Sequence, residues 1–332
     1  MKAPLVSVIM PLRNAASFVE DAIRSVLAQT ESDLELIVVD DASSDGSGDL
    51  VRAFSDGRLR LLRGESPLNA AGARNLALAE ARGEFVAFLD ADDFAERDRL
   101  ERQIRFLRQI PGVAVVASEV TLMDEKGARL GKAFPSRRAD EIPATLLFEN
   151  CLALSSVMAW RADLLPFRPE FAPAEDYDLW MRLAHAGGFA ILPKALTHYR
   201  MHGGSVSASQ PEKMRAAVAR IHAAQLAVLG FREAPPIHCL FAAWPLDAGA
   251  AQLAEAEAWL LALGSANERH GAYARAPFQR VLAARWFSIC LDSWLLGWPV
   301  WSVYHRSPLA VPTFRRRAHL LRRLLPQRLR QR

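Results

Sequence analysis

The residues in this sequence with the clearest capacity for chemistry are the carboxylates of Asp90-Ala91-Asp92-Asp93, which directly follow the apolar run at 85–89. Clustered like charges repel one another unless a cation lies among them. Mg²⁺ and Mn²⁺ bind a few carboxylate oxygens together with phosphate oxygens, so a divalent metal carrying a phosphorylated ligand fits this cluster. A solvated acidic turn is the alternative. It is less favoured because α/β sheets bind ligands just beyond the carboxyl ends of their strands.

Length and composition indicate a chain with room for more than one folded unit. It has 332 residues, of which 51% are hydrophobic, enough for a sizeable core and too many for a disordered protein. Its three cysteines, Cys151, Cys239 and Cys290, are widely spaced, which suits a reducing compartment and matches neither a disulfide framework nor a zinc motif. No secretory signal precedes the first strand-like segment, so we expect a cytoplasmic protein.

The first half of the sequence alternates strand-like and helix-like segments. Alternation of this kind predicts an α/β fold with a Rossmann-like, mostly parallel central sheet covered by helices on both faces. The middle of the chain is less regular. Strands are expected at 5–10, 34–39, 58–63, 84–89, 113–118, 152–160, 190–193 and 196–200, and helices at 69–82, 96–109 and 175–186.

A polar, serine-rich link at 205–211 marks the expected domain boundary. Two helical segments rich in alanine and leucine follow it, at 212–229 and 249–263. We therefore expect an α/β domain over residues 1–207 and a mainly helical C-terminal region over residues 208–332.

Six segments, taken in order, resemble the family 2 glycosyltransferases, which have the GT-A fold. One such segment alone is a weak signal, whereas six in this order and spacing are specific. The resemblance covers residues 4–207 and implies a nucleotide-diphosphate-sugar donor, a hydroxyl acceptor and inversion at the anomeric carbon. The segments are VSVIMP at 6–11 with Asn14, VVDDASSDGS at 38–47, GARN at 72–75, DADD at 90–93, EDYDLWMRL at 175–183 and YRMHGGS at 199–205.

The resemblance implies a donor site built from the loops after the first strands. Pro11, Arg13 and Asn14 would lie along the nucleoside, although Arg13 stands where an aromatic residue is frequent. Asp41 would contact the base or ribose, and the alternative for it is a helix or turn cap. Arg74 would pair with phosphate oxygens in two-pronged geometry, against the alternative of a solvated helix arginine.

The run Asp90-Ala91-Asp92 corresponds to the Asp-x-Asp motif of the family. By this resemblance the run binds the nucleotide sugar, Asp92 ligates Mg²⁺ or Mn²⁺, and Asp90 meets the ribose, or the metal through water. Asp93 would support these ligands from outside, and His202 is a weaker candidate metal ligand. The resemblance therefore implies an enzyme that depends on a divalent metal.

Glu175 and Asp176 are the expected catalytic residues. Transfer requires removal of a proton from the acceptor hydroxyl, and a carboxylate does this when burial and neighbouring acids raise its pKa. The resemblance places the general base at Asp176, with Glu175 orienting the acceptor; an acidic helix start favoured by the dipole is the alternative. His198, Arg200 and His202, beside two glycines, are expected in a lid over the diphosphate or metal.

The sequence of the C-terminal third predicts a protein that binds to a membrane surface without spanning the bilayer. The stretch 281–304 is interrupted by Arg285, Asp292 and Pro299, so it offers no unbroken apolar span. The Gln-x-x-Arg-Trp motif of processive synthases is also missing, because Gln279 and Arg285 stand at another spacing, so we expect one sugar per encounter. Five aromatic residues suit the lipid headgroup region: Trp286, Trp294, Trp298, Trp301 and Tyr304.

The extreme C-terminus is strongly basic. Nine arginines and no acidic residue lie between Arg306 and Arg332, so the rest of the chain is net acidic although the protein carries +4 overall. At about 1 kcal/mol per arginine near an anionic surface, this tail favours peripheral attachment to the inner face of the membrane. A packed helical subdomain with a solvated basic end is the alternative, and no nucleic-acid partner is expected.

Three function classes stay open at this point. A glycosyltransferase with a UDP-sugar as the default donor and a glycan or lipid-linked acceptor accounts for all six segments. An inactive nucleotide-sugar-binding scaffold would carry the same segments. A flavodoxin-like regulatory module is suggested by Asp40-Asp41 after a strand, but it leaves the acidic run at 90–93 and the Glu175-Asp176 pair unexplained.

Overall fold

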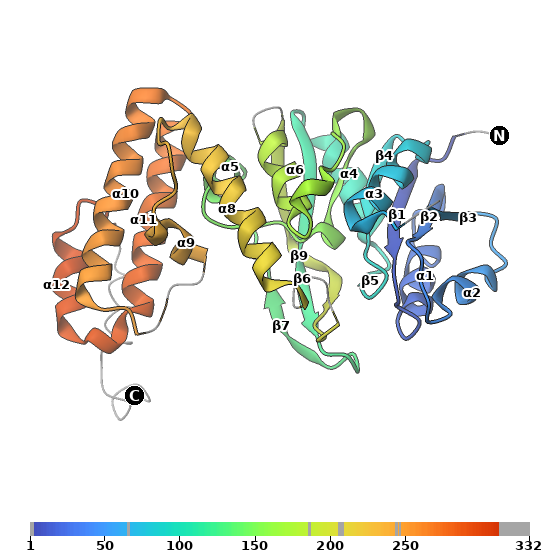
Figure 1. Ribbon diagram of the computed structural model, residues 1–332. Coiled ribbons are helices and arrows are strands. Elements are labelled where there is room, and N and C mark those ends of the chain that lie inside the picture. The colour runs from blue at the N-terminus through green and yellow to red at the C-terminus, as the bar shows by residue number, and fades with distance from the viewer. Residues whose placement is uncertain are drawn as a thin grey trace, which may run out of the picture. The chain divides into compact units, whose positions relative to one another are not determined.

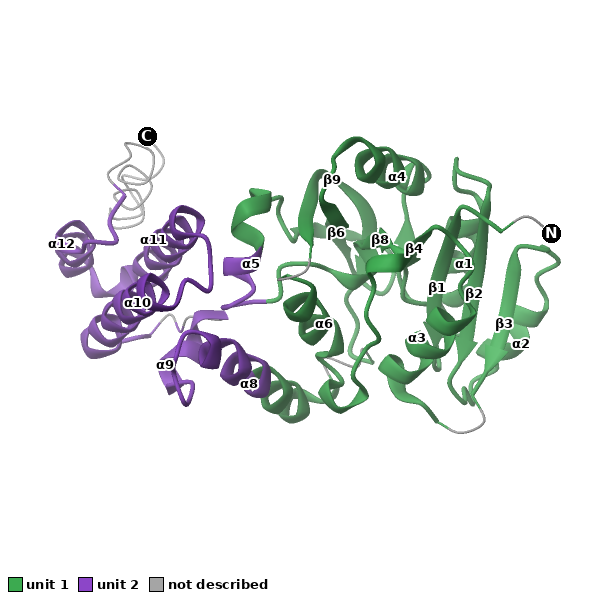
Figure 2. Cartoon of the chain, turned by 90° about the horizontal axis from the view of Figure 1, so that it is seen from above, with its two compact units in different colours: residues 1–142, 150–218 green, residues 143–149, 219–332 purple. Residues whose placement is uncertain are grey.

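The computed structural model describes residues 3–64, 67–184, 187–204, 209–242, 245 and 247–311. The chain forms two compact units, drawn in different colours in Figure 2. Unit 1 comprises residues 1–142 and 150–218, and unit 2 comprises residues 143–149 and 219–332. The sequence predicted a single boundary after residue 207. It did not predict that the short segment 143–149, which lies in the first half of the chain, belongs to unit 2.

One mixed β-sheet forms the centre of unit 1 (Figure 1). Among the described residues its strands follow the order β3-β2-β1-β4-β8-β6-β9-β5, and β7 pairs with β6 beside this path. The strands are β1 (Val6–Leu12), β2 (Leu34–Asp40), β3 (Leu59–Arg63), β4 (Phe85–Phe88), β5 (Phe94–Ala95), β6 (Val113–Met123), β7 (Arg129–Ala133), β8 (Met158–Trp160) and β9 (Gly188–Arg200).

The expected α/β class is confirmed, but the sheet is mixed rather than mostly parallel. Strands β1 to β4 pair in parallel, because a helix crossover separates each from the next in the chain. Strand β8 is antiparallel to both β4 and β6, and β5 is antiparallel to β9. The hairpin of β6 and β7 and the loops around β8 provide no such crossovers, so the second half of the sheet is not held to parallel pairing.

Several helices of unit 1 complete the α/β arrangement. They are α1 (Val19–Leu27), α2 (Ser47–Arg52), α3 (Asn69–Glu80), α4 (Arg99–Gln109) and, later in the chain, α6 (Glu175–Leu183). Ile23 of α1 and Ile104 of α4 share one buried cluster with Val8, Met10 and Leu36 of the sheet. All seven residues of β2 are buried, as expected for a strand covered on both faces. This packing fixes where β1, β2 and β4 end.

Unit 2 is helical. It contains α9 (Pro236–Cys239), α10 (Ala250–His270), α11 (Arg275–Asp292) and α12 (Trp298–Arg306), while α5 (Ile142–Thr145) and α8 (Pro211–Val228) each include residues of both units. Leu260, Leu263 and Ile289 lie in its core with Trp286 and Tyr304. Within the described ranges, no helix has the length and apolar character needed to cross a membrane.

The expectation that Trp286 and Tyr304 lie in the headgroup region is wrong, because both side chains are fully buried in unit 2. Their apolar surface is already covered by the helices of that unit, so it is not available to lipid. The arginine-rich run from Arg315 onward lies outside the described residues.

Candidate active site

Loops at one edge of the sheet carry the first group of candidate residues. Strands β2, β1 and β4 are parallel neighbours, so their carboxyl ends meet at this edge. Pro11 lies within β1, and Arg13 and Asn14 follow its last residue. Asp41 follows β2 directly, and Asp90 comes shortly after β4. The structure therefore brings the expected nucleoside-binding and acidic segments to a common edge.

Asp41 is buried and ties together the loops of this edge. One of its carboxylate oxygens accepts a hydrogen bond from the Leu68 backbone N–H at 2.5 Å, and the other pairs with the exposed Arg13 guanidinium at 3.3 Å. Asn14, with a φ of 51°, accepts a hydrogen bond from the Ser44 backbone N–H at 2.8 Å. These contacts fix the loops. Recognition of a nucleoside by the same residues stays a prediction.

A buried guanidinium joins three segments that lie far apart in the sequence. Arg74 of α3 donates to Asp90 Oδ1 at 2.7 Å and to Oε1 of Glu175, the first residue of α6, at 2.5 Å. The Arg74 and Glu175 side chains are 7% and 6% exposed. Burial opposes the charge of Arg74, but the carboxylates of Asp90 and Glu175 raise its pKa above the ordinary value. Arg74 Nε and Glu175 Oε2 are buried without a hydrogen-bond partner, so both retain capacity for a ligand.

Asp176, the next residue of α6, has the acid–base property expected of a general base. Burial and then the charge of Glu175 raise the pKa of Asp176 to about 7, against the lowering effect of Arg74. Its Oδ2 accepts a hydrogen bond from Asn150 Nδ2 at 2.9 Å, and its Oδ1 accepts one from the Tyr177 backbone N–H at 2.7 Å. A carboxyl group with a pKa near the working pH is well suited to proton abstraction.

The acidic turn holds more negative charge than its neighbours neutralise. Burial and the charge of Asp90 raise the pKa of Asp92, and burial and the charge of Asp92 raise the pKa of Asp93 well above its usual range. Asp92 Oδ2 lies 2.8 Å from His202 Nε2, and Asp93 Oδ1 accepts a hydrogen bond from the Arg200 backbone N–H at 2.8 Å. Such crowding favours a cation at this turn.

Carboxylates of the acidic turn and of α6 both raise the pKa of one side chain, Tyr199. Burial raises the pKa of the Tyr199 hydroxyl above its ordinary value, and so do the charges of Asp93, Asp90, Asp92 and Asp176. The geometric link between the turn and α6 is Arg74, which pairs with Asp90 of the turn and with Glu175, the residue before Asp176.

Two of the three residues expected in a lid lie in a strand instead. His198 and Arg200 belong to β9, and His198 Nε2 lies 2.7 Å from Glu96 Oε1. The buried Arg200 donates from its guanidinium to the Asp92 carbonyl at 2.8 Å. Strand pairing and these contacts hold both residues in place, so a moving loop is not supported for them. His202 lies beyond the strand, and its place in a lid stays a prediction.

Sequence reasoning did not single out Asn150, which donates a hydrogen bond to Asp176, or Tyr199, whose pKa is raised by burial and by carboxylate charges. Asn150 follows the apolar run at 146–148, and a polar side chain inside such a stretch was the available signal. Tyr199 lies in a strand candidate whose pattern indicated burial alone. Ala91, expected to lie against the nucleotide sugar, is buried between the two aspartates of the motif.

The donor atoms of Asp90, Asp92 and His202 suit Mg²⁺ or Mn²⁺. In the part of the chain that the structure describes, no group of three or more His, Cys, Asp or Glu side chains forms a metal cage. Mg²⁺ is often held by one or two carboxylates plus substrate phosphates and water rather than by an all-protein cage. The residues present therefore fit a metal that binds together with a nucleotide diphosphate.

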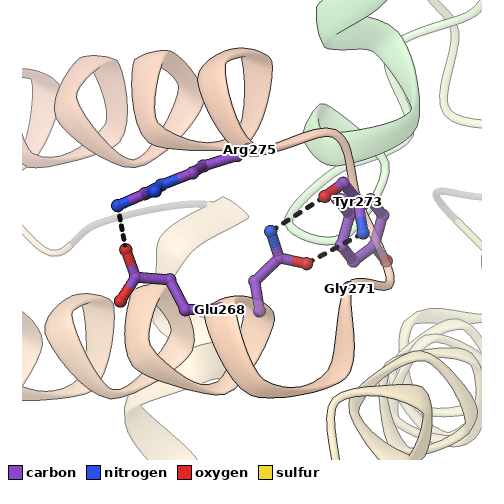
Figure 3. Close-up of a pocket in the computed structure, with 5 residues that line it drawn as sticks. Glu268, Gly271, Tyr273 and Arg275 are labelled. Carbon is purple, nitrogen blue, oxygen red and sulfur yellow. Dashed lines mark hydrogen bonds and ion pairs between the residues drawn. The ribbon is translucent and has the colours of Figure 1, made fainter.

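A separate pocket of about 480 Å³ lies in unit 2, where α10 turns into α11 (Figure 3). Asn267 exchanges two hydrogen bonds with the Tyr273 backbone, at 3.0 and 2.8 Å, and Arg275 pairs with Glu268 at 2.9 Å. Gly271, in the left-handed conformation, forms the turn between the helices. Because these polar groups pair with one another, we interpret the pocket as part of the helix–helix turn and not as a ligand site.

The fold is of the GT-A class. The structure titled "Mannosyltransferase PcManGT from Pyrobaculum calidifontis in complex with GDP-Man and Mn2+" aligns with 97% of this chain and 86% of its own, with a TM-score of 0.53. At 20% sequence identity this likeness shows the fold alone.

The sequence comparisons identify the family. The family model "Glycosyl transferase family 2" matches residues 7–164. "Putative teichuronic acid biosynthesis glycosyltransferase TuaG" of Bacillus subtilis is 31% identical over 250 residues, which cover 73% of this chain and 92% of that protein. "UDP-Glc:alpha-D-GlcNAc-diphosphoundecaprenol beta-1,3-glucosyltransferase WfgD" of Escherichia coli is 34% identical over 214 residues, covering 64% and 83%. The chain belongs to glycosyltransferase family 2.

The buried ion pair of Arg74 and Glu175, called the buried bridge below, leads to a prediction about stability. Arg74→Met should lower the free energy of unfolding by about 3–5 kcal/mol, because it leaves the buried Glu175 carboxylate without its partner. Adding Glu175→Gln should recover part of the loss, since no unpaired charge then stays buried. Arg102→Met is the control: it removes an exposed pair with Asp98 and should cost less than about 1 kcal/mol. Chemical denaturation at pH 7 measures all three, and equal losses for Arg74→Met and Arg102→Met would contradict a buried bridge.

Proposed function

We propose that this glycosyltransferase moves one sugar per encounter from a UDP-sugar to a hydroxyl group of a lipid-linked glycan precursor, with inversion at the anomeric carbon. The observation that carries the proposal is the pKa of Asp176, raised to about 7 beside the buried Arg74–Glu175 bridge. The relative WfgD supports the substrates, because its name specifies UDP-Glc as donor, a diphosphoundecaprenol-linked sugar as acceptor and a β-1,3 linkage as product.

In this proposal the sheet edge binds the donor. Asp41, with Pro11, Arg13 and Asn14, contacts the nucleoside at the ends of β1 and β2. The guanidinium of Arg74 contacts the diphosphate through its unpartnered Nε or by exchange with Asp90. A buried arginine suits this task because it stays charged and offers several donors in a fixed plane.

Asp176 removes the proton of the acceptor. As the acceptor oxygen forms its bond to the anomeric carbon, the Asp176 carboxylate takes the hydroxyl proton. The bond between that carbon and the diphosphate oxygen breaks, and UDP leaves with the electron pair. Attack on the face opposite to UDP inverts the configuration. Glu175 assists in two ways: its charge raises the pKa of Asp176, and its unpartnered Oε2 can accept a hydrogen bond from the acceptor.

Asp92, with Asp90 and His202 near it, would hold a Mg²⁺ or Mn²⁺ ion that arrives with the nucleotide. When bound, this ion neutralises charge on the departing diphosphate. The raised pKa of Asp92 supports the assignment, because the repulsion behind it is relieved by a cation.

The base assignment predicts both an inactive variant and a pH profile. Asp176→Asn should lower transfer from UDP-glucose by about 10²-fold or more, because the amide cannot accept the proton, while UDP affinity measured by calorimetry stays unchanged. In the wild type kcat/KM should rise with pH and level off above about 7, since Asp176 is active when deprotonated. Asp98→Asn, at an exposed ion pair, is the control and should stay active.

Full activity in Asp176→Asn would show that another group is the base. A wild type that binds UDP but neither hydrolyses nor transfers the donor sugar would support the inactive scaffold instead.

The metal assignment predicts a ligand-dependent shift in stability. UDP with Mn²⁺ should raise the Tm of the wild type more than UDP alone, and a ligand at a hundred times its Kd contributes about 2.7 kcal/mol. Asp92→Asn should lose the Mn²⁺-dependent part and keep the rest, whereas Asp98→Asn should keep both. A Mn²⁺-dependent rise that survives in Asp92→Asn would rule out Asp92 as the ligand. Differential scanning fluorimetry measures the shifts.

We also propose that the C-terminal end of unit 2 attaches the enzyme to an anionic membrane. Leu295, between α11 and α12, and Trp298, the first residue of α12, are 59% and 58% exposed, unlike the buried Trp286 and Tyr304. Beyond them the sequence supplies the arginine-rich run from Arg315. Exposed apolar residues that are followed in the sequence by basic ones suit the interface of anionic lipids, where a lipid-linked acceptor would lie.

The attachment is tested with vesicles of phosphatidylcholine with and without phosphatidylglycerol. The wild type should sediment with the anionic vesicles, and replacing Arg315, Arg316 and Arg317 with glutamate should weaken binding by about 10²-fold or more, at about 1 kcal/mol per arginine. The same replacement of Arg102, Arg105 and Arg108 on α4 changes the net charge equally and should leave binding nearly intact. Equal losses for both triple variants would argue against the tail as the attachment site.

A further inference from the structure

The segment 143–149 interrupts unit 1 in the sequence and packs in unit 2 (Figure 2). Leu147 and Phe148 are fully buried there, in the same cluster as Phe241 and Trp286. Residue 150 is the first to belong to unit 1 again. The chain leaves this segment and enters the α/β unit at Asn150.

A buried histidine anchors the backbone of this segment. His238 Nδ1 accepts a hydrogen bond from Trp259 Nε1 at 3.1 Å, and His238 Nε2 lies 3.0 Å from the Leu147 carbonyl oxygen. Because Nδ1 accepts, the proton is on Nε2, which donates to Leu147. Burial lowers the pKa of His238 to about 3, so the imidazole is neutral at physiological pH and this pair of hydrogen bonds is kept.

An arginine of α11 anchors the side chains of the same segment. Arg285 pairs with Glu149 Oε2 at 3.0 Å and donates to the Phe241 carbonyl at 2.8 Å. Its guanidinium also lies over the Phe148 ring, 5.3 Å from the centroid. The Arg285 side chain is largely buried, so these contacts are stronger than those of an exposed pair. The last residues before position 150 are thus held by apolar, polar and charged contacts together.

Asn150 comes directly after this anchor and contacts the proposed base. Its Nδ2 donates to Asp176 Oδ2 at 2.9 Å, and its Oδ1 accepts a hydrogen bond from the Leu152 backbone N–H at 3.2 Å. With both ends of the amide engaged, the donor points at one carboxylate oxygen. A hydrogen bond to the ionised form lowers the pKa of the carboxyl group and restricts its orientation.

We propose that Asn150 is the positioning residue of Asp176. The proposal rests on the proposed role of Asp176 as general base. Through its hydrogen bond to Oδ2, Asn150 orients the Asp176 carboxylate towards the acceptor hydroxyl.

The first test replaces Asn150 with leucine, which is similar in size and introduces no charge. In Asn150→Leu, kcat should fall by about tenfold or more with the donor KM unchanged, as expected when an orienting contact is lost. The acid limb of the kcat/KM profile should move to higher pH, because the hydrogen bond that lowers the pKa of Asp176 is gone. A role limited to holding the turn would leave this limb unmoved. Wild-type kcat and an unmoved limb in Asn150→Leu would overturn the proposal.

Arg275→Met is the control for this comparison, because it breaks an exposed arginine–glutamate pair and should change neither kcat nor the acid limb.

The second test uses Asp176→Asn to distinguish a wrong positioning role for Asn150 from a wrong assignment of Asp176 as the base. If Asp176→Asn is inactive and Asn150→Leu behaves as the wild type, the positioning role alone is wrong. If Asp176→Asn keeps full transfer, the base assignment itself fails, and the positioning role fails with it.

Discussion

The buried charge of Arg74 is the interaction on which the site depends. A guanidinium does not lose its proton in a protein, so it can be buried only with carboxylate partners. Asp90 and Glu175 are those partners, and they tie α3, the turn after β4 and the first residue of α6 into one arrangement. Since Asp176 follows Glu175, the same bridge sets where the candidate base stands relative to the acidic turn.

Burial and repulsion between like charges have two consequences in this unit. At the turn, burial and the charge of Asp90 raise the pKa of Asp92, which favours a bound cation. On α6, burial and then the charge of Glu175 raise the pKa of Asp176 to about 7, which suits proton abstraction near neutral pH. The charge of Arg74 opposes the rise at Asp176. Burial and neighbouring carboxylates thus act together at both places.

The sequence predicted the sheet edge well and the second half of the sheet poorly, for a physical reason. Two strands that lead into carboxylates could be predicted from apolar runs, Leu34–Asp40 and the residues before Asp90. Such a run is a local pattern in the sequence. The partner of a strand is not a local property, so the antiparallel placement of β8 could not be predicted. For the same reason the sequence could not show whether Trp286 faces lipid or the core of its own unit.

The segment 143–149 shows the limit of local patterns most clearly. Leu147 and Phe148 would suit any core, and nothing in their order says that they belong to helices about a hundred residues later in the chain. Only the folded chain shows that this segment belongs to the core of unit 2, whereas the next residue, Asn150, belongs to unit 1 and donates a hydrogen bond to Asp176. A run of apolar residues therefore predicts burial, but it does not predict the unit in which those residues are buried.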